Sequence, residues 1–280
     1  MKKLFSLLVC VMFGVLLLTG CGQDYEYYNA EDGEDVLTIV TSPDYAPYEF
    51  VKDPNVTNSY TKYGGADIEV MKYIATELGM KLKITEADFS VCPTDVNSGK
   101  ADLSISGFSW TPTRAENYEL SKSYFNEGDG NQEVMINVAD AEKFTSFADI
   151  NKSDVKVGCQ AGSLQEEYVD AYLPNCDKQS FDNIDQAIIY LKNGSFDCVV
   201  LSEFTIDVRT EIDDTFCSMG VTFNEEFSLA VPGMVVLAKK GNTELIDKVN
   251  VAVEKMIENN LYSQWMEEAT TEASNLGLDD

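Results

Sequence analysis

The chain has 280 residues, and its 44% apolar and 11% aromatic content is typical of a globular protein rather than a disordered or fibrous one. Because one hydrophobic core seldom organises so many residues, the length predicts two domains or two lobes. The formal net charge is −28 and histidine is absent, which argues against nucleic acid as a partner and excludes Ser-His or Cys-His catalysis and His-ligated zinc.

The N-terminus has the pattern of a secretion signal. Two lysines precede an apolar run over residues 4–18, which is shorter than a membrane-spanning helix requires. The run ends in LTGC at residues 18–21, and small residues before a cysteine resemble the signal of bacterial lipoproteins, in which that cysteine is acylated. We therefore expect a lipoprotein signal peptide over residues 1–20 and a lipid on Cys21. A plain secretory signal or an uncleaved anchor is the alternative.

The next segments predict an acidic tether followed by an α/β fold. Residues 21–35 have no apolar period and are expected to be a solvated tether. Val36–Thr41 is predicted to be a strand, and a proline-rich turn follows it. Ala66–Leu78 has its apolar residues on one helical face and ends at Gly79, and residues 245–261 repeat this pattern. Strands that alternate with helices of these lengths favour an α/β protein.

Two segments of the chain resemble each other, since each has a helix end, a glycine, a turn and a buried strand. Asp102 aligns with Asp197 just before the predicted strands Leu103–Ser106 and Cys198–Leu201. This similarity has two explanations. One is coincidence, because the arrangement is common in α/β folds. The other is a pair of similar lobes, which also fits the length of the chain. Ligands of open α/β sheets bind beyond the carboxyl ends of strands, so both strand exits are candidates for a binding cleft.

Five cysteines follow Cys21, an odd number without a CxxC motif. Buried free thiols are the favoured interpretation, and one disulfide within the second lobe is the alternative. The five are Cys92, Cys159, Cys176, Cys198 and Cys217.

Arg114 is the first candidate for a binding residue. Thr111 followed by Pro112 predicts a helix N-terminus, which puts Arg114 at the third helical position. A cation there is disfavoured by roughly 0.3–1 kcal/mol, because it faces the positive end of the helix dipole. Arg114 therefore needs an anion, which is either Glu116 or another acid of the chain, or the carboxylate of a ligand gripped together with Ser109.

A second helix start and two aromatic residues are weaker candidates. The chain leaves a strand through Gly162 into a helix capped by Ser163, and the free N–H groups there could hold a carboxylate. Ser163 and Glu166 also fit a capping box, which would use one of those N–H groups. Tyr45 and Phe89 follow strand-like runs and could flank a ligand side chain, although isolated aromatic residues are more often part of the core.

These segments resemble the extracellular solute-binding proteins of ABC importers for polar amino acids. The resemblance spans nearly all of residues 36–270, and the order of the segments behind a lipoprotein signal is more specific than any one of them. The segments are SPDYAPYEF (42–50), GADIEVMKYIATELG (65–79), SGKADLSISGFSWTPTR (98–114), ELSKSYF (119–125), VGCQAGSLQEEY (157–168), GSFDCVVLSE (194–203) and the closing stretch 233–265.

The resemblance implies a two-lobed periplasmic-binding-protein-like α/β fold, in which two hinge crossovers join the lobes around an inter-lobe cleft that closes on ligand. Lobe 1 would be discontinuous and lobe 2 would lie between its parts. The implied ranges are 36–128 and 233–273 for lobe 1, 129–232 for lobe 2, and 274–280 for a C-terminal tail.

The resemblance also implies site residues. Arg114, Ser109 and the backbone N–H groups of Ser163 and Leu164 would bind a ligand α-carboxylate, and the carbonyl of Gly107 would accept from its α-ammonium. The side chain of the ligand would lie near Tyr45, Phe89, Ser42, Gln160 and Trp110.

Three positions depart from the family pattern. Ser202 stands where the family often has an aspartate for the α-ammonium, so either the neighbouring Glu203 takes that role or the ligand lacks a standard α-amino group. Ser42 stands where cation-binding members have an acid, which argues against lysine or arginine as ligand. Trp110 occupies a position that is usually aliphatic.

The resemblance implies a lipid-anchored receptor on the extracellular face of a bacterial membrane. It would capture an amino acid or similar zwitterion, close on it and deliver it to an ABC permease. We expect a monomer with no cofactor and no metal, whose partners are the small ligand, the permease subunits and, through the lipid, the membrane. The alternatives are a dehydratase-like enzyme on the same fold, with Glu203 as its acid or base, and a ligand-sensing subunit of a signalling system.

Overall fold

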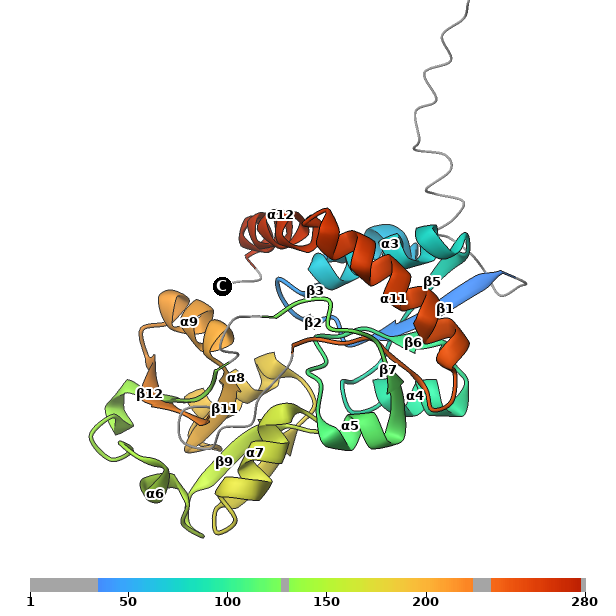
Figure 1. Ribbon diagram of the computed structural model, residues 1–280. Coiled ribbons are helices and arrows are strands. Elements are labelled where there is room, and N and C mark those ends of the chain that lie inside the picture. The colour runs from blue at the N-terminus through green and yellow to red at the C-terminus, as the bar shows by residue number, and fades with distance from the viewer. Residues whose placement is uncertain (1–34, 127–130, 224–232, 278–280) are drawn as a thin grey trace, which may run out of the picture.

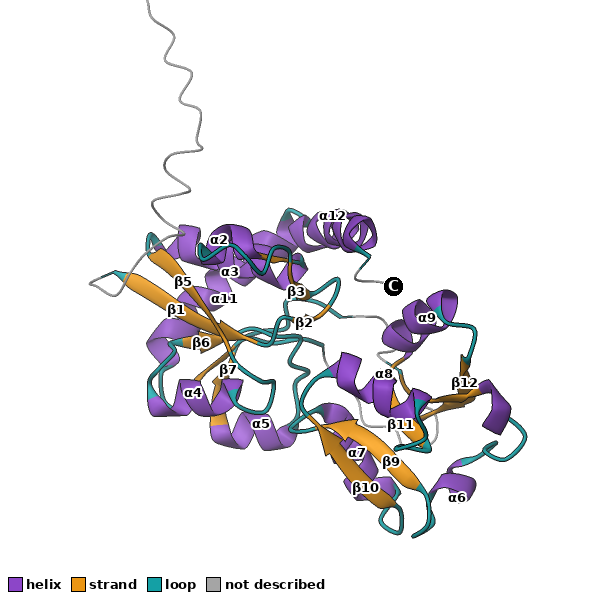
Figure 2. Ribbon diagram, turned by 180° about the vertical axis from the view of Figure 1, so that it is seen from behind, coloured by secondary structure: helices purple, strands orange, loops and turns teal. Residues whose placement is uncertain are grey.

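A computed structural model describes residues 35–126, 131–223 and 233–277, and the structural statements below refer to these residues. They form two lobes, each built on a five-stranded sheet with helices on both faces (Figures 1 and 2). The predicted signal peptide, Cys21 and residues 22–34 lie outside the described part, as do the segments 127–130 and 224–232 near the expected lobe boundaries. Within the described part, none of the helices has the length and apolar character that crossing a bilayer requires.

The first lobe is built on the strand order β5-β1-β6-β13-β7. Strands β5 and β6 both run parallel to β1, whereas β13 runs antiparallel to its neighbours β6 and β7. Strand β13 follows all the strands of the second lobe in the sequence, but in this sheet it lies between β6 and β7. The bounds are β1 Val36–Thr41, β5 Lys81–Glu86, β6 Leu103–Ser104, β7 Tyr118–Leu120 and β13 Leu237–Lys239.

Alternate residues of β1 face opposite sides of this sheet, as a strand buried on both faces requires. Ile39 packs in one core with Met71 of α3, whereas Val40 packs in the other core with Val96 of α4. The predicted stop of α3 is confirmed, because Gly79 has φ 66° and donates its N–H to carbonyls of the last turn. The helices of this lobe are α2 Ser59–Lys62, α3 Ala66–Leu78, α4 Cys92–Ser98, α5 Pro112–Asn117, α11 Thr243–Glu258 and α12 Leu261–Leu276.

The second lobe is built on the strand order β10-β9-β11-β8-β12, in which β9 lies parallel to β10 and β11, and β8 is antiparallel to β11 and β12. Its strands are β8 Gln132–Asn137, β9 Lys156–Gln160, β10 Asp177–Phe181, β11 Cys198–Ser202 and β12 Phe216–Thr222. Helix α7 packs on one face, and α8 and α9 pack on the other. Its helices are η1 Val138–Asp140, α6 Phe147–Ile150, α7 Leu164–Tyr172, α8 Ile184–Lys192 and α9 Glu203–Ile212.

The internal similarity seen in the sequence has a structural counterpart. Asp102 accepts a hydrogen bond from the backbone N–H of Thr38 on β1 at 2.8 Å, and Asp197 accepts one from Lys156 on β9 at 2.9 Å. Both aspartates precede an internal strand and bind the start of the parallel strand beside it. The two lobes therefore share this local arrangement of an aspartate and two parallel strands.

A small three-stranded sheet lies between β1 and α3 in the chain, and its first strand contacts α8 of the second lobe. It consists of β2 (Asp44–Tyr45), β3 (Glu49–Val51) and β4 (Tyr63–Gly64). Gly65, at the start of α3, has φ 121°, and a Cβ there would lie 2.1 Å from the carbonyl oxygen of Tyr48. Only glycine allows the helix to approach this sheet so closely.

Two predicted elements and the predicted C-terminal tail have other bounds in the structure. The strand predicted over Leu103–Ser106 ends at Ser104. The helix predicted over residues 245–261 is α11, but it ends at Glu258; Asn260, with a left-handed φ of 51°, separates it from α12, which begins at Leu261. Helix α12 continues to Leu276 and is capped by Gly277, so residues 274–276 of the predicted C-terminal tail are helical. The five cysteines are free thiols, as favoured, but only Cys92, Cys159 and Cys198 are buried, whereas Cys176 and Cys217 are partly exposed.

Candidate functional site

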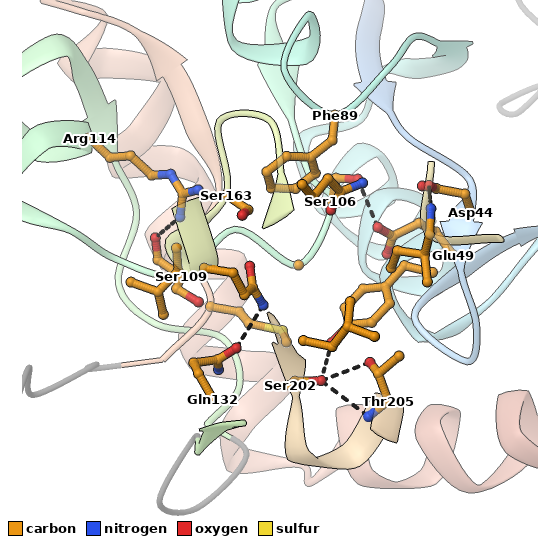
Figure 3. A pocket seen from close by; sticks show the side chains of 18 residues that line it. Asp44, Glu49, Phe89, Ser106, Ser109, Arg114, Gln132, Ser163, Ser202 and Thr205 are labelled. Carbon is orange, nitrogen blue, oxygen red and sulfur yellow. Dashed lines mark hydrogen bonds between the residues drawn. The ribbon is translucent and has the colours of Figure 1, made fainter. Parts of the chain in front are cut away.

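A pocket lies between the two lobes, and both strand exits identified in the sequence contribute to it (Figure 3). It holds about 630 Å³, including the part open to solvent. Ser106 and Gly107 follow β6 in the first lobe, and Ser202 ends β11 in the second. This agrees with the preference of ligands for the carboxyl ends of strands.

Arg114 lines this pocket from the first turn of α5. Thr111 caps the helix by accepting a hydrogen bond from the backbone N–H of Arg114 at 3.2 Å, as predicted. The guanidinium donates Nη1–H to the carbonyl of Ser109 and Nη2–H to the carbonyl of Gly162 in the other lobe, the latter at 3.0 Å. Burial leaves the side chain with little access to water and lowers the pKa of Arg114 to about 10.

Arg114 forms no ion pair with any acid of the described residues, so the local pair with Glu116 is not formed. Its two hydrogen bonds go to neutral carbonyls, and a guanidinium has five N–H donors. Buried charges in proteins are usually paired. The site therefore has a buried cation with donors left for an anion.

The start of α7 also lines the pocket, and its capping differs in part from the prediction. Ser163 accepts from the N–H of Glu166 at 3.1 Å, which is the first half of a capping box. The Glu166 carboxylate accepts from the N–H of Gly162 rather than of Ser163, whose N–H donates to the carbonyl of Gln160. Leu164 is the first residue of α7, so its N–H has no intrahelical acceptor and is available in the pocket.

Tyr45 and Phe89 both line the pocket, and each is backed by a second aromatic ring. The ring of Tyr45 stacks on Tyr48 with centroids 4.6 Å apart, and Phe89 stacks on Phe108 at 4.5 Å. Tyr45 also shares a hydrogen bond of 3.0 Å with the hydroxyl of Ser202 across the cleft. The stacking fixes both rings as walls of the pocket.

Ser202 lies in the pocket and Glu203 does not. The Ser202 hydroxyl caps α9 by accepting from the N–H of Thr205, and it shares a hydrogen bond of 2.8 Å with the Thr205 hydroxyl. The Glu203 carboxylate instead accepts from the side-chain amide of Asn131 at 2.9 Å. The two residues are adjacent, but the turn into α9 separates their side chains.

Of the other residues predicted for the site, Gly107 and Gln160 line the pocket and Ser42 and Trp110 do not. Gly107 lines the pocket with φ 59°, and its N–H donates to Asp67. Gln160 also lines it and donates to the carbonyl of Asp182 at 3.1 Å. Ser42 and Trp110 do not line the pocket. Ser42 is buried, lines an adjoining crevice and donates its hydroxyl to Asp44, and Trp110 packs against the core beside α4.

Comparison with known proteins places the chain in a family. Residues 37–269 match the bacterial extracellular solute-binding proteins, family 3. The chain belongs to this family. This confirms the resemblance seen in the sequence and the two-lobed fold that it implied.

Several amino-acid-binding proteins resemble the chain over most of its length. The arginine-binding extracellular protein ArtP of Bacillus subtilis is 26% identical to this chain, and the match covers 92% of this chain and 94% of ArtP. The glutamine-binding protein GlnH of the same organism is 23% identical over 97% of this chain and 100% of its own. A Streptococcus pneumoniae amino-acid ABC transporter substrate-binding protein bound to L-arginine superposes with a TM-score of 0.74, at 29% identity, covering 85% and 96% of the two chains.

This solute-binding protein has two acids in its pocket that were not predicted, Asp44 and Glu49. Asp44 accepts from the hydroxyl of Ser42 at 2.8 Å and from the N–H of Ile184 at 3.3 Å, and burial raises its pKa to about 6. Glu49 is 1% exposed, and burial together with the nearby Asp67 raises its pKa well above the usual range.

A signal for Glu49 was present in the sequence. It stands between Tyr48 and Phe50, and an acid enclosed by large apolar residues in a short strand indicates a buried carboxyl group. Asp44 has no comparable signal, because its place in the pocket depends on the contact with α8 of the second lobe. Ser106, Gln132, Gln165 and Thr205 also line the pocket and were not predicted.

Proposed function

We propose that this protein is the substrate-binding component of an amino-acid importer, which captures an amino acid between its lobes and presents it to an ABC permease. The observation that supports this most directly is the buried guanidinium of Arg114, which lines the inter-lobe pocket and pairs with no acid of the described residues. The named relatives support it too, because they bind amino acids such as arginine, glutamine and cystine. Their names leave the ligand side chain open.

In this proposal the α-carboxylate binds the guanidinium of Arg114 and the N–H of Leu164, beside Ser109 and Ser163. Hydrogen bonds between ionised groups are strong, and exclusion of water in the closed cleft strengthens them further. The α-ammonium lies near the carbonyl of Gly107 and the hydroxyl of Ser202.

The rings of Tyr45 and Phe89 enclose the ligand side chain, and Gln160 lies at the same wall. Because the anchors come from both lobes, the ligand stabilises the closed state over the open one.

The importer role implies an extracellular protein, as the family name states. We propose that residues 1–20 are removed, that Cys21 carries lipid, and that residues 21–35 tether the folded part to the outer face of the membrane. The lobes would be 36–128 with 233–273 and 129–232, in a monomer that needs no cofactor.

An enzyme on this fold is the less supported alternative. One structural relative is described as an ancestral amino-acid-binding protein and a precursor of cyclohexadienyl dehydratase, at 26% identity and a TM-score of 0.69. The named relatives are binding proteins, which supports binding rather than turnover. Glu203, the acid that the enzyme alternative relied on, points to Asn131 and not into the pocket.

Isothermal titration calorimetry against a panel of amino acids tests the proposal. We expect at least one amino acid to bind and Arg114→Ala to abolish that binding. Arg209→Ala is the matched control, since Arg209 pairs with Asp185 on the surface and should not affect affinity. Undiminished binding by Arg114→Ala would remove the proposed anchor.

A further inference from the structure

The pocket has its charges at opposite sides. Arg114, Asp44 and Glu49 are its acidic or basic lining residues within the described part of the chain. Figure 3 shows Arg114 on one side of the pocket and Asp44 and Glu49 on the other. A ligand held by its carboxylate at Arg114 would therefore extend toward two acids.

These acids have no cation of the protein beside them. Neither Asp44 nor Glu49 forms an ion pair with a described lysine or arginine. The Oε1 atom of Glu49 accepts from the hydroxyl of Ser106 at 2.7 Å, but its buried Oε2 atom accepts from no described donor.

Behind Glu49, Asp67 adds a third buried carboxyl group. Its oxygens accept from the N–H of Gly107 and from the hydroxyls of Tyr124 and Tyr262, which are neutral donors. Without a counter-ion, burial favours the protonated form of these carboxyl groups, and a cation brought by the ligand would favour their ionised form.

On the basis of the proposed function, we propose that Asp44, supported by Glu49, binds a positively charged group at the far end of the ligand, so that the preferred ligands are amino acids with a basic side chain. The serine at position 42 argued against such ligands. The structure shows that Asp44, two residues later, supplies an acid to the pocket, and that Ser42 donates a hydrogen bond to it.

Asp44 has a second contact that could explain its presence without any ligand. It accepts from the N–H of Ile184, the first residue of α8 in the other lobe, and this contact alone would stabilise lobe closure. The experiment must therefore separate recognition of a cation from closure of the cleft.

Arginine and citrulline provide that separation, because they have the same shape and differ in the charge of the terminal group. We expect the wild-type protein to bind arginine roughly 10- to 100-fold more tightly than citrulline, as measured by calorimetry. Asp44→Asn keeps an oxygen for the N–H of Ile184 and loses the charge. It should remove most of the preference for arginine and leave citrulline binding nearly unchanged.

Glu49→Gln should reduce the preference in the same direction, and Asp247→Asn, an exposed acid on α11 of the first lobe, is the matched control. Equal binding of arginine and citrulline by the wild-type protein would overturn the proposal. Equal weakening of both ligands by Asp44→Asn would also overturn it, because Asp44 would then act only in closure. Circular dichroism checks that each variant is folded. If Arg114→Ala leaves the binding of both ligands intact, the proposed function fails instead.

Discussion

The guanidinium of Arg114 donates a hydrogen bond across the cleft to Gly162, with 3.0 Å between Nη2 of Arg114 and the carbonyl oxygen of Gly162. The same residue thus belongs to the proposed carboxylate site in one lobe and contacts the helix start of the other. The planar guanidinium can bind a ligand carboxylate and the Gly162 carbonyl together, because its five N–H donors point in different directions within one plane. A point charge has no such geometry.

Arg114→Lys tests this geometry. A lysine keeps the positive charge but cannot reach the carbonyls of Ser109 and Gly162 and a ligand carboxylate together, so we expect amino-acid affinity to fall roughly 10- to 100-fold. Calorimetry measures the loss, and Arg209→Lys on the surface of α9 is the control. Wild-type affinity in Arg114→Lys would show that charge alone is sufficient.

Tyr45→Phe tests the contact that joins the lobes at Ser202. The substitution keeps the ring stacked on Tyr48 and removes the hydroxyl that shares a hydrogen bond with Ser202. We expect the closed state to lose about 0.5–1.5 kcal/mol and ligand affinity to fall up to about tenfold. Tyr190→Phe, at a ring that packs on Phe196 away from the pocket, should bind as the wild type does. An unchanged affinity of Tyr45→Phe would mean that the contact contributes nothing to closure.

The binding of a basic ligand should depend on pH through Asp44. Its pKa of about 6 means that it is ionised at pH 7.5 and mostly protonated at pH 5. A cation prefers the ionised form, so arginine affinity should fall roughly tenfold from pH 7.5 to pH 5, while citrulline affinity stays nearly constant. Calorimetry on the wild type and Asp44→Asn at both pH values measures this. A variant that keeps the full pH dependence would assign the effect to another group.

Other acids lie around Asp44 and must be considered in this titration. Asp185 on α8 raises the pKa of Asp44 by charge repulsion, and Glu49 lies in the same pocket. The adjoining crevice is lined by Glu86, Asp88 and Asp182. These neighbours are all acidic and so favour the protonated form of Asp44.

Asp102→Ala and Asp197→Ala test the equivalence of the two lobes. Each removes a carboxylate that accepts from the start of a neighbouring strand, so we expect each to lower the free energy of unfolding by about 1 kcal/mol. The two losses should add, because the residues lie in separate lobes. Urea unfolding measures them, with Asp247→Ala on the exposed side of α11 as control. A large loss from one variant and none from the other would contradict equal roles.

Cys21→Ala tests the proposed anchor. If Cys21 is acylated, the mature wild-type protein has the added mass of its lipid and stays in the membrane fraction, whereas the variant is released. Mass spectrometry and cell fractionation measure both properties. Cys10→Ala, within the predicted signal peptide, is the control. Retention of Cys21→Ala in the membrane would favour an uncleaved N-terminal helix.

Local features of the fold were predictable because neighbouring residues decide them. The bounds of β1 and α3 follow from the apolar pattern and from Gly79, and the cap by Thr111 placed Arg114 in the first turn of α5. The break at Asn260 was missed, because a single asparagine with a left-handed φ leaves little trace in an apolar pattern that continues on both sides.

The site was predictable where one strand exit or helix start decides a position, and not where two lobes meet. The places of Gly107 and Ser202 follow from strands that end there. The place of Asp44 depends on a short hairpin and on α8 of the other lobe, which no local pattern encodes. The choice between Ser202 and Glu203 depends on the turn into α9, where one residue of displacement directs a side chain out of the pocket.

The position of β13 between β6 and β7 bears on the order in which the lobes fold. Leu237 pairs with Ser104 on one side and with Leu120 on the other, so the first sheet has a gap until this late strand arrives. All five strands of the second sheet lie within residues 132–222, before β13 in the chain. During synthesis the N-terminal part of the chain appears first. The second lobe therefore has all five strands of its sheet while the sheet of the first lobe still lacks β13. The lobe that begins first in the sequence is the one that finishes last.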